Sequence, residues 1–217
     1  DGLMVDGSTL PWAENIQVTA HAVQIAHQRG RPVEAELGRL AGTEDDITVA
    51  DYEASLTDPM EAVAFCRETK CDALAVCIGN VHGTYPPGGV EKVDLERLGR
   101  IQTALREHMG AGAPVLVLHG ASGLPEEVVR GAIALGVVKL NVNTEVRRAY
   151  MDAVRGAPPD EDLTDLMGRG FRAMKARWRE YEKARIVSIR GLQRAGGFSF
   201  YFRKGVTDYD PRALERA

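Results

Sequence analysis

Residues 115–123 read VLVLHGASG, in which four apolar, strand-forming residues lead directly into a histidine and a glycine. Such a run suits a strand buried on both faces, so a polar residue at its end needs an explanation. Four other apolar runs also have polar residues at or just beyond their carboxyl ends, at residues 2–6, 32–37, 73–78 and 137–142. The polar residues around these ends are Asp6, Glu36, His82, His119, Asn141, Asn143 and Thr144. Polar residues after five runs indicate a functional site.

Segments with helical periodicity separate the apolar runs. The expected helices run from Pro11 to Gly30, from Pro59 onward with Asp58 as the N-cap, from about Asp94 to Met109, from Pro125 to Gly136, and from Thr144 to about Arg155. Proline at a first helical position and aspartate at an N-cap are typical helix starts. The alternation of strands and helices predicts a parallel sheet with helices packed outside it.

Two architectures fit this alternation: a doubly wound open sheet and a (β/α)₈ barrel. In a barrel the carboxyl ends of all strands face one mouth, so polar residues from several strands converge there. In an open sheet, ligands bind at one switch point between two strands, so polar residues at the ends of five successive strands would not all reach one site. We therefore expect an α/β fold that is a partial (β/α)₈ TIM barrel.

The chain divides into residues 1–155, which carry the expected barrel strands, and residues 156–217, which form a C-terminal helical extension. After the linker GAPPDED, a long helix is expected from Leu163 to Arg185, followed by a tail with alternating phenylalanines. The apolar positions expected near one helix face are Leu163, Leu166 or Met167, Phe171, Met174 and Trp178. The opposite, arginine-rich face is expected to be solvated, the alternative being a surface for RNA or an acidic partner.

Composition excludes several functional classes. The 217 residues are 44% hydrophobic and carry a net charge of −4, which suits one globular unit with no general attraction to nucleic acid. No apolar run has the roughly 20 residues of a membrane span, and no signal peptide is recognisable, so we expect a cytoplasmic protein without membrane or nucleic-acid partners. The three cysteines lack zinc-ribbon spacing and are expected to be reduced and packed.

Two histidines stand out chemically because each follows an apolar run and precedes a glycine. His82 lies in NVHG and His119 in LHGAS, and neutral imidazole is the commonest zinc ligand, so a catalytic metal is plausible. The stretches HGASG and NVNTE offer backbone N–H groups and hydroxyls for phosphate. The acidic loop ELGRLAGTEDD, which includes Glu44, could supply a carboxylate for proton transfer.

Five ordered motifs resemble the class II, zinc-dependent ketose-bisphosphate aldolases of the fructose- and tagatose-bisphosphate type. The motifs are MVDGS, EAELGRLAGTEDD, IGNVHGTY, VLHGASGLP and VVKLNVNTE, within residues 2–150. The resemblance implies that His82 and His119 bind the catalytic zinc, that Glu44 takes part in proton transfer and that Asn141 contacts the bound triose. It further implies substrate contacts through the phosphate-binding segments and their neighbours, at Gly83, Gly120, Ala121, Ser122, Val142, Asn143 and Thr144.

The resemblance also bears on further cofactors. Asp6 and Glu36 match positions that hold a second metal in some family members, while Thr43 stands where a further acidic ligand would be. Glu36 or a water molecule could also complete the catalytic zinc site. Besides Zn²⁺, a monovalent cation is an expected cofactor. The implied partners are a phosphorylated sugar and further copies of the chain, as dimers or tetramers.

The larger departure from the family is an absence. Family members carry three βα units before the first motif. The third strand of those units ends in an Asp-His pair, which supplies the first zinc histidine and the aspartate of acid–base catalysis. No Asp-His pair occurs in these 217 residues. The five strands are thus expected to be strands four to eight of the barrel.

The implied reaction is reversible cleavage of a ketose 1,6-bisphosphate, fructose or tagatose, to dihydroxyacetone phosphate and glyceraldehyde 3-phosphate. Three alternatives stay open: a catalytically incomplete phosphosugar-binding or assembly module, an interaction protein that uses the basic helix at residues 163–185, and a lysine-dependent aldolase that uses Lys139.

Overall fold

A computed structural model describes residues 2–38, 41–44, 47–49, 56–182 and 198–201. Its main sheet has six strands in the order β1-β2-β5-β7-β8-β9. The first five are mutually parallel: β1 (Leu3–Val5), β2 (Val33–Leu37), β5 (Ala73–Val76), β7 (Val115–Leu118) and β8 (Val137–Val142). All five coincide with the expected apolar runs, so the predicted parallel α/β sheet is confirmed.

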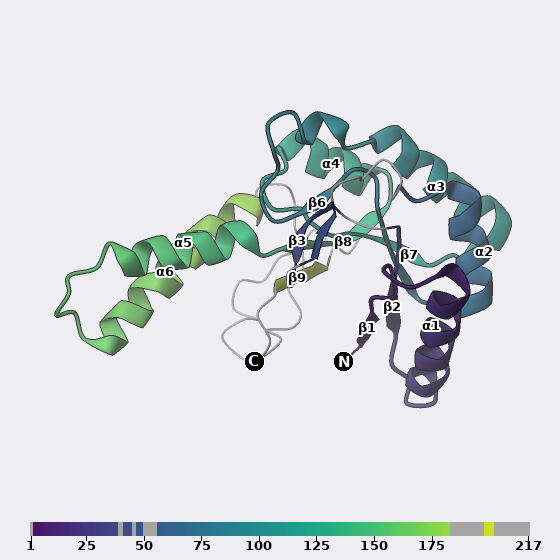
Figure 1. Ribbon diagram of the computed structural model, residues 1–217, viewed down its shortest axis with the longest axis horizontal. Helices are drawn as coiled ribbons and strands as arrows, with labels where there is room; N and C mark the ends of the chain where they lie inside the picture. Colours follow the sequence, from purple (N-terminus) through teal and green to yellow (C-terminus); the bar gives the residue numbers. More distant parts are fainter. Residues whose placement is uncertain (1, 39–40, 45–46, 50–55, 183–197, 202–217) are drawn as a thin grey trace.

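Helices α1 to α4 cover one face of this sheet (Figure 1). They span Trp12–His27, Pro59–Thr69, Leu95–Met109 and Glu126–Ala134, with short 3₁₀ helices at Val90–Lys92 and Gly110–Gly112. The expected cap at Asp58 is present, because its side chain accepts from the amides of Met60 and Glu61. Asp94 caps α3 in a similar way by accepting from the amide of Arg97. These bonds satisfy amides that have no partner within the helix.

Alternation along the strands gives the sheet two chemically different faces. On β2, the side chains of Val33, Ala35 and Leu37 belong to the apolar core shared with the helices, whereas Glu34 and Glu36 lie between them in sequence. Successive side chains of a strand point to opposite faces, so both glutamates lie on the face away from the helices. On β8, Leu140 and Val142 join the core, which puts Lys139 and Asn141 on the glutamate face.

A second sheet forms where the sequence suggested only an acidic loop. Strand β3 (Ala41–Glu44) pairs antiparallel with β4 (Ile47–Val49) and parallel with β6 (Val81–His82). The expectation of a loop throughout residues 36–46 was therefore wrong. Glycine and acidic residues disfavour strands locally, but here pairing with a segment nearly 40 residues away decides the conformation, and β propensity is strongly context-dependent.

Beyond the sheet, α5 (Thr144–Arg155) and α6 (Leu163–Glu182) form a hairpin that projects from the rest of the molecule (Figure 1). Both helices were expected, although residues 183–185 of the predicted long helix lie outside the described residues. The rings of Tyr150 and Phe171 meet edge to face with centroids 5.8 Å apart. The predicted apolar stripe of α6 is only partly covered: Met174 and Trp178 pack against the core, whereas Phe171 remains 54% exposed.

The other sequence expectations concern the tail, the cysteines and membranes. Strand β9 (Phe198–Tyr201) pairs antiparallel with β8, so part of the tail covers that edge of the sheet. Cys66, Cys71 and Cys77 are buried and form no disulfide, as predicted. Within the described ranges, no helix is both long and apolar enough to cross a membrane.

Candidate metal and substrate site

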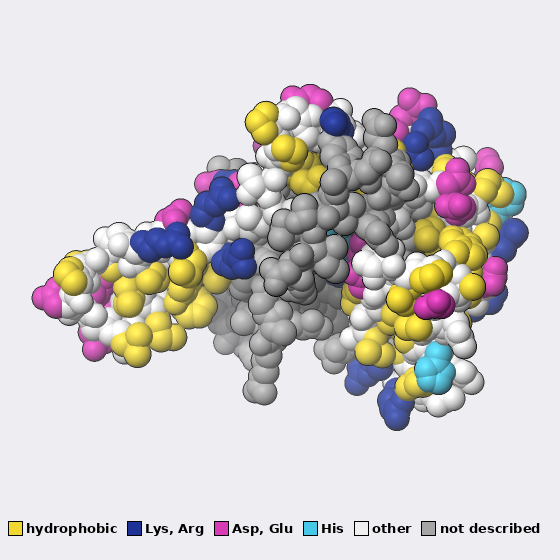
Figure 2. All heavy atoms as spheres, viewed as in Figure 1, with side chains coloured by type: hydrophobic (Ala, Val, Ile, Leu, Met, Phe, Trp, Pro, Cys, Tyr) yellow, Lys and Arg dark blue, Asp and Glu magenta, His cyan; other side chains and the backbone are white. Residues whose placement is uncertain are grey.

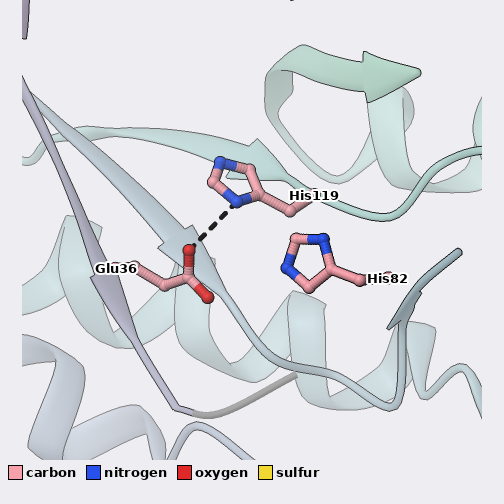
Figure 3. A group of neighbouring side chains, drawn as sticks. All are labelled: Glu36, His82 and His119. Atoms are coloured by element: carbon pink, nitrogen blue, oxygen red, sulfur yellow. Dashed lines mark ion pairs between the residues drawn. The ribbon is translucent and has the colours of Figure 1, made fainter. Parts of the chain in front are cut away.

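Three of the predicted residues meet at the carboxyl ends of the strands. Glu36 comes from β2, His82 from β6 and His119 from the residue that follows β7 (Figure 3). One ligand atom of each lies within 4.8 Å of the others. Glu36 and His119 are 2% and 5% exposed, and His82 is half-buried. Carboxylate oxygen and imidazole nitrogen are both ordinary zinc ligands, so the donor set fits a zinc ion.

His119 lies between two carboxylates. Its Nδ1 is 3.0 Å from Oε2 of Glu36, on the side of the ring that faces the cluster with His82. Its Nε2 is 2.8 Å from Oε1 of Glu34, whose other oxygen lies 2.5 Å from Nζ of Lys139. Glu34 and Lys139 are almost fully buried. Each ring nitrogen of His119 therefore has its own acidic partner.

These contacts set the charges at the site. Burial opposes the positive form of His119, but the hydrogen bonds to Glu34 and Glu36 outweigh burial and raise its pKa to about 9. Burial also opposes the negative form of Glu34, yet the hydrogen bond to His119 and the charge of Lys139 hold the pKa of Glu34 below its usual value. Without metal, the cluster at neutral pH holds a protonated imidazole between two carboxylates.

Asn80 and Tyr85, which were not predicted as site residues, hold the histidine segments together. The Asn80 side chain accepts from the amide of Ile78 and donates to the carbonyl of His119 at 2.9 Å. The hydroxyl of Tyr85 donates to the carbonyl of Gly120, also at 2.9 Å. Both residues lie in the motif IGNVHGTY, but the carbonyls to which they donate are 39 and 35 residues away, so only the fold reveals their function.

Gly120 is required by its surroundings. Its φ of +62° is unfavourable for residues with a side chain, and a Cβ built on it would lie 2.1 Å from the carbonyl oxygen of Val81. The segments that carry His82 and His119 therefore touch through backbone atoms at this point.

The predicted phosphate segments are hydrogen-bonded to each other. The amide of Ala121 donates to the carbonyl of Asn141 at 3.0 Å, and the amide of Asn143 donates to Oγ of Ser122 at 3.0 Å. Thr144 begins α5, whose N-cap residue Asn143 makes no side-chain capping bond. The start of a helix is a common binding position for an anion.

Asn141 carries an orphaned polar atom. Its Oδ1 is buried and has no hydrogen-bond partner among the described residues. Buried polar atoms are nearly always paired in native proteins, so an unpaired one at a predicted substrate contact suggests that a ligand supplies the partner.

The remaining predicted residues are less closely joined to the cluster. Gly83 follows His82 with φ +92°, and Val142 has its side chain in the apolar core. Asp6 is exposed and accepts the amide of Ser8 at 2.9 Å, outside the Glu36, His82 and His119 group. Glu44 ends β3, two residues after Gly42, which is in register with His82. The roles of these residues remain predictions.

Arg148 is another residue that sequence reasoning missed. It lies on α5, and its Nη2 donates to Oγ1 of Thr84 at 3.0 Å, so it brings a positive charge next to Gly83. No local pattern distinguishes it from the other arginines of that helix.

The chain is thus an α/β protein in which Glu36, His82 and His119 form a candidate metal site at the carboxyl ends of parallel strands. The sequence profile of the family described as "Fructose-bisphosphate aldolase class-II" matches residues 1–187. The chain therefore belongs to the class II fructose-bisphosphate aldolase family, as its motifs predicted.

Solved structures agree with this assignment. A putative fructose-1,6-biphosphate aldolase from Coccidioides immitis superposes with a TM-score of 0.72 at 36% identity, over 83% of this chain and 61% of that one. The YdjI aldolase from Escherichia coli K12 gives 0.64 at 34% identity, over 84% and 59%. A fructose-bisphosphate aldolase from Campylobacter jejuni, at 24% identity and 0.64 over 83% and 59%, supports the fold alone. The chain thus spans about three fifths of the length of these structures.

Proposed function

We propose that this chain forms the greater part of a zinc-dependent aldolase that reversibly cleaves a ketose 1,6-bisphosphate to dihydroxyacetone phosphate and glyceraldehyde 3-phosphate. The observation that carries the proposal is the convergence of Glu36, His82 and His119 within 4.8 Å in a member of the class II family. Fructose and tagatose bisphosphates, which differ at one stereocentre, are both candidate substrates.

His82 and His119 would hold the zinc, with Glu36 as a further ligand. When bound, zinc supplies Lewis acidity at the substrate ketone and offsets the negative charge that develops on its oxygen. The geometry also disfavours the lysine-dependent alternative. A Schiff base forms at the lysine amine itself, whereas Nζ of Lys139 is buried in an ion pair 2.5 Å from Oε2 of Glu34.

The substrate phosphate would be bound by Gly83 together with two adjacent segments. One segment contains Gly120, Ala121 and Ser122, and the other contains Val142, Asn143 and Thr144. Val142 would contribute through its backbone because its side chain is in the core. The uncapped start of α5 and the nearby guanidinium of Arg148 support an anion at this position.

Two residues would act on the sugar itself. Asn141 would bind the triose through its buried, unpartnered Oδ1, which can accept a hydrogen bond from a substrate hydroxyl. Glu44 would move a proton at the reacting carbon, and its position on a strand next to the His82 segment supports that role. Asp6, a second metal and a monovalent cation belong to the proposal through the family resemblance alone.

The five parallel strands would be strands four to eight of a (β/α)₈ barrel, with residues 1–155 as its carboxyl-terminal part and residues 156–217 as an extension. The coverage of about three fifths of the solved relatives supports this assignment. A cytoplasmic homo-oligomer is proposed as well. Exposed apolar side chains gather on the α5–α6 hairpin, where Figure 2 shows them on its surface, and would suit contact between copies: Met151, Leu163, Met167 and Phe171.

The experiment compares cleavage of fructose and tagatose bisphosphates by two zinc-loaded proteins. One is the 217-residue chain, and the other also carries three preceding βα units, from its gene or from a structural relative. Only two histidine ligands and no Asp-His pair are present in the 217 residues, so the short chain should be slower by about 10²–10⁴-fold or more. Binding of both sugars without cleavage by the completed protein would favour the phosphosugar-binding module.

A further inference from the structure

We propose that Glu34, held by Lys139, is a positioning residue that fixes the ring of His119 so that Nδ1 is presented to the metal. The inference rests on the proposed function, because it requires that Glu36, His82 and His119 bind zinc. It assigns a function to the buried ion pair of Glu34 and Lys139, which lies on the face of the sheet away from the helices and outside the proposed set of metal ligands.

The geometry divides the two nitrogens of His119 between two tasks. Nδ1 faces Glu36 and the metal cluster, whereas Nε2 lies 2.8 Å from Oε1 of Glu34. An imidazole that gives the lone pair of Nδ1 to a metal carries its proton on Nε2. Glu34 is the acceptor for that proton, which is the arrangement that commonly orients metal-bound histidines and raises their basicity.

Glu34 can perform this function only if its own position is fixed. Its second oxygen is 2.5 Å from Nζ of Lys139, and Glu34 and Lys139 are 8% and 5% exposed. A buried carboxylate without a partner would be costly, and Lys139 neutralises its charge. The three residues come from β2, β8 and the end of β7, so the sheet itself sets the ring orientation.

A purely structural ion pair is the competing interpretation, and a matched pair of double variants separates the two. Glu34→Gln with Lys139→Met removes both charges but keeps an oxygen that can accept from Nε2. Glu34→Leu with Lys139→Met removes both charges and the acceptor, with little further change in volume. Any difference between the two therefore reports the hydrogen bond to His119. Val63→Ala, which truncates a buried α2 residue away from the site, controls for general destabilisation.

The probe is zinc alone, titrated into the 217-residue chain against a chromophoric chelator. The leucine double variant should bind zinc about 10–100-fold more weakly than the glutamine double variant, the usual effect of losing such a partner. In ¹⁵N-resolved spectra of the zinc-loaded chain, the His119 Nε2–H proton should be slow to exchange in the wild type and glutamine variant, and lost in the leucine variant. Val63→Ala should match the wild type in both readouts.

Equal zinc affinity and equal Nε2–H exchange in the two double variants, with tight wild-type binding, would overturn the positioning role and leave the metal site intact. Failure of the wild type to bind zinc, or binding unaffected by His82→Ala, would instead overturn the metal site and the positioning role with it. If the leucine variant does not fold, Glu34→Asp replaces it. This change keeps the charge but withdraws the carboxylate, and it should weaken zinc binding by about tenfold relative to the glutamine double variant; equal affinity would overturn the inference.

Discussion

Nδ1 of His119 lies 3.0 Å from Oε2 of Glu36, on the side of the ring where the metal ligands converge. In the metal-free protein a proton occupies this contact, because the hydrogen bonds to the two glutamates overcome the opposing effect of burial and raise the pKa of His119 to about 9. Zinc and a proton therefore compete for the same nitrogen.

The first prediction is that zinc binds more tightly as the pH rises toward 9. Each ion bound should displace about one proton from His119, so the apparent affinity should rise by roughly tenfold per pH unit below the pKa. Competition titrations between about pH 6.5 and pH 8, with calorimetry in buffers of different ionisation enthalpy, measure both quantities. Affinity that does not change with pH would show that His119 is already neutral.

The stability of the metal-free chain should change in the opposite direction. The pKa of His119 in the folded protein, about 9, exceeds the ordinary value of about 6.5 expected in the unfolded chain. The resulting stabilisation is complete below about pH 6.5 and is lost as the pH rises through about 9. Urea unfolding of the wild type and of His119→Asn across this range should show a steeper decline in the wild type. Parallel curves would contradict the shifted pKa.

Glu44→Gln in the complete enzyme should lower kcat far more than it changes substrate affinity. A group that transfers a proton acts chiefly in the transition state, and such catalysis typically contributes about 10²–10⁴-fold. Steady-state kinetics with both bisphosphates measure the effect, with a change of the exposed α2 residue Glu61, Glu61→Gln, as a control. A rise in KM with unchanged kcat would assign Glu44 to binding.

Ser122→Ala should weaken the binding of dihydroxyacetone phosphate by about 1–3 kcal/mol. The change removes the Ser122 hydroxyl from the proposed phosphate site. In the wild type, the amide of Asn143 donates to this hydroxyl, so the variant also loses that hydrogen bond. Calorimetry on the complete, zinc-loaded enzyme tests this, and Asn143→Ala should act in the same direction. Unchanged affinity in both variants would place the phosphate elsewhere.

Sequence patterns were sufficient for features that depend on local chemistry. The five parallel strands follow from apolar runs, and the helix start at Asp58 follows from N-cap preference. The meeting of Glu36, His82 and His119 could also be expected, since residues at the carboxyl ends of parallel strands share one edge.

Features that depend on distant partners could not be predicted in this way. The strand at Ala41–Glu44 forms because β4 and β6 pair with it, which the glycine and acidic residues of that segment do not suggest. Glu34 lies within the motif EAELGRLAGTEDD, but its proposed role depends on His119 and Lys139, which are 85 and 105 residues away. Tyr85 was missed for the same reason, because its acceptor, the carbonyl of Gly120, belongs to another strand end.

The most direct test of the central claim, that zinc and not a lysine activates the substrate, is the activity of the complete enzyme after two treatments. We expect chelation to abolish cleavage of the ketose bisphosphates and added zinc to restore it. Borohydride with substrate should leave activity unchanged, because Lys139 is paired with Glu34. Activity that survives chelation but is lost on borohydride treatment would contradict the account and identify a Schiff-base lysine.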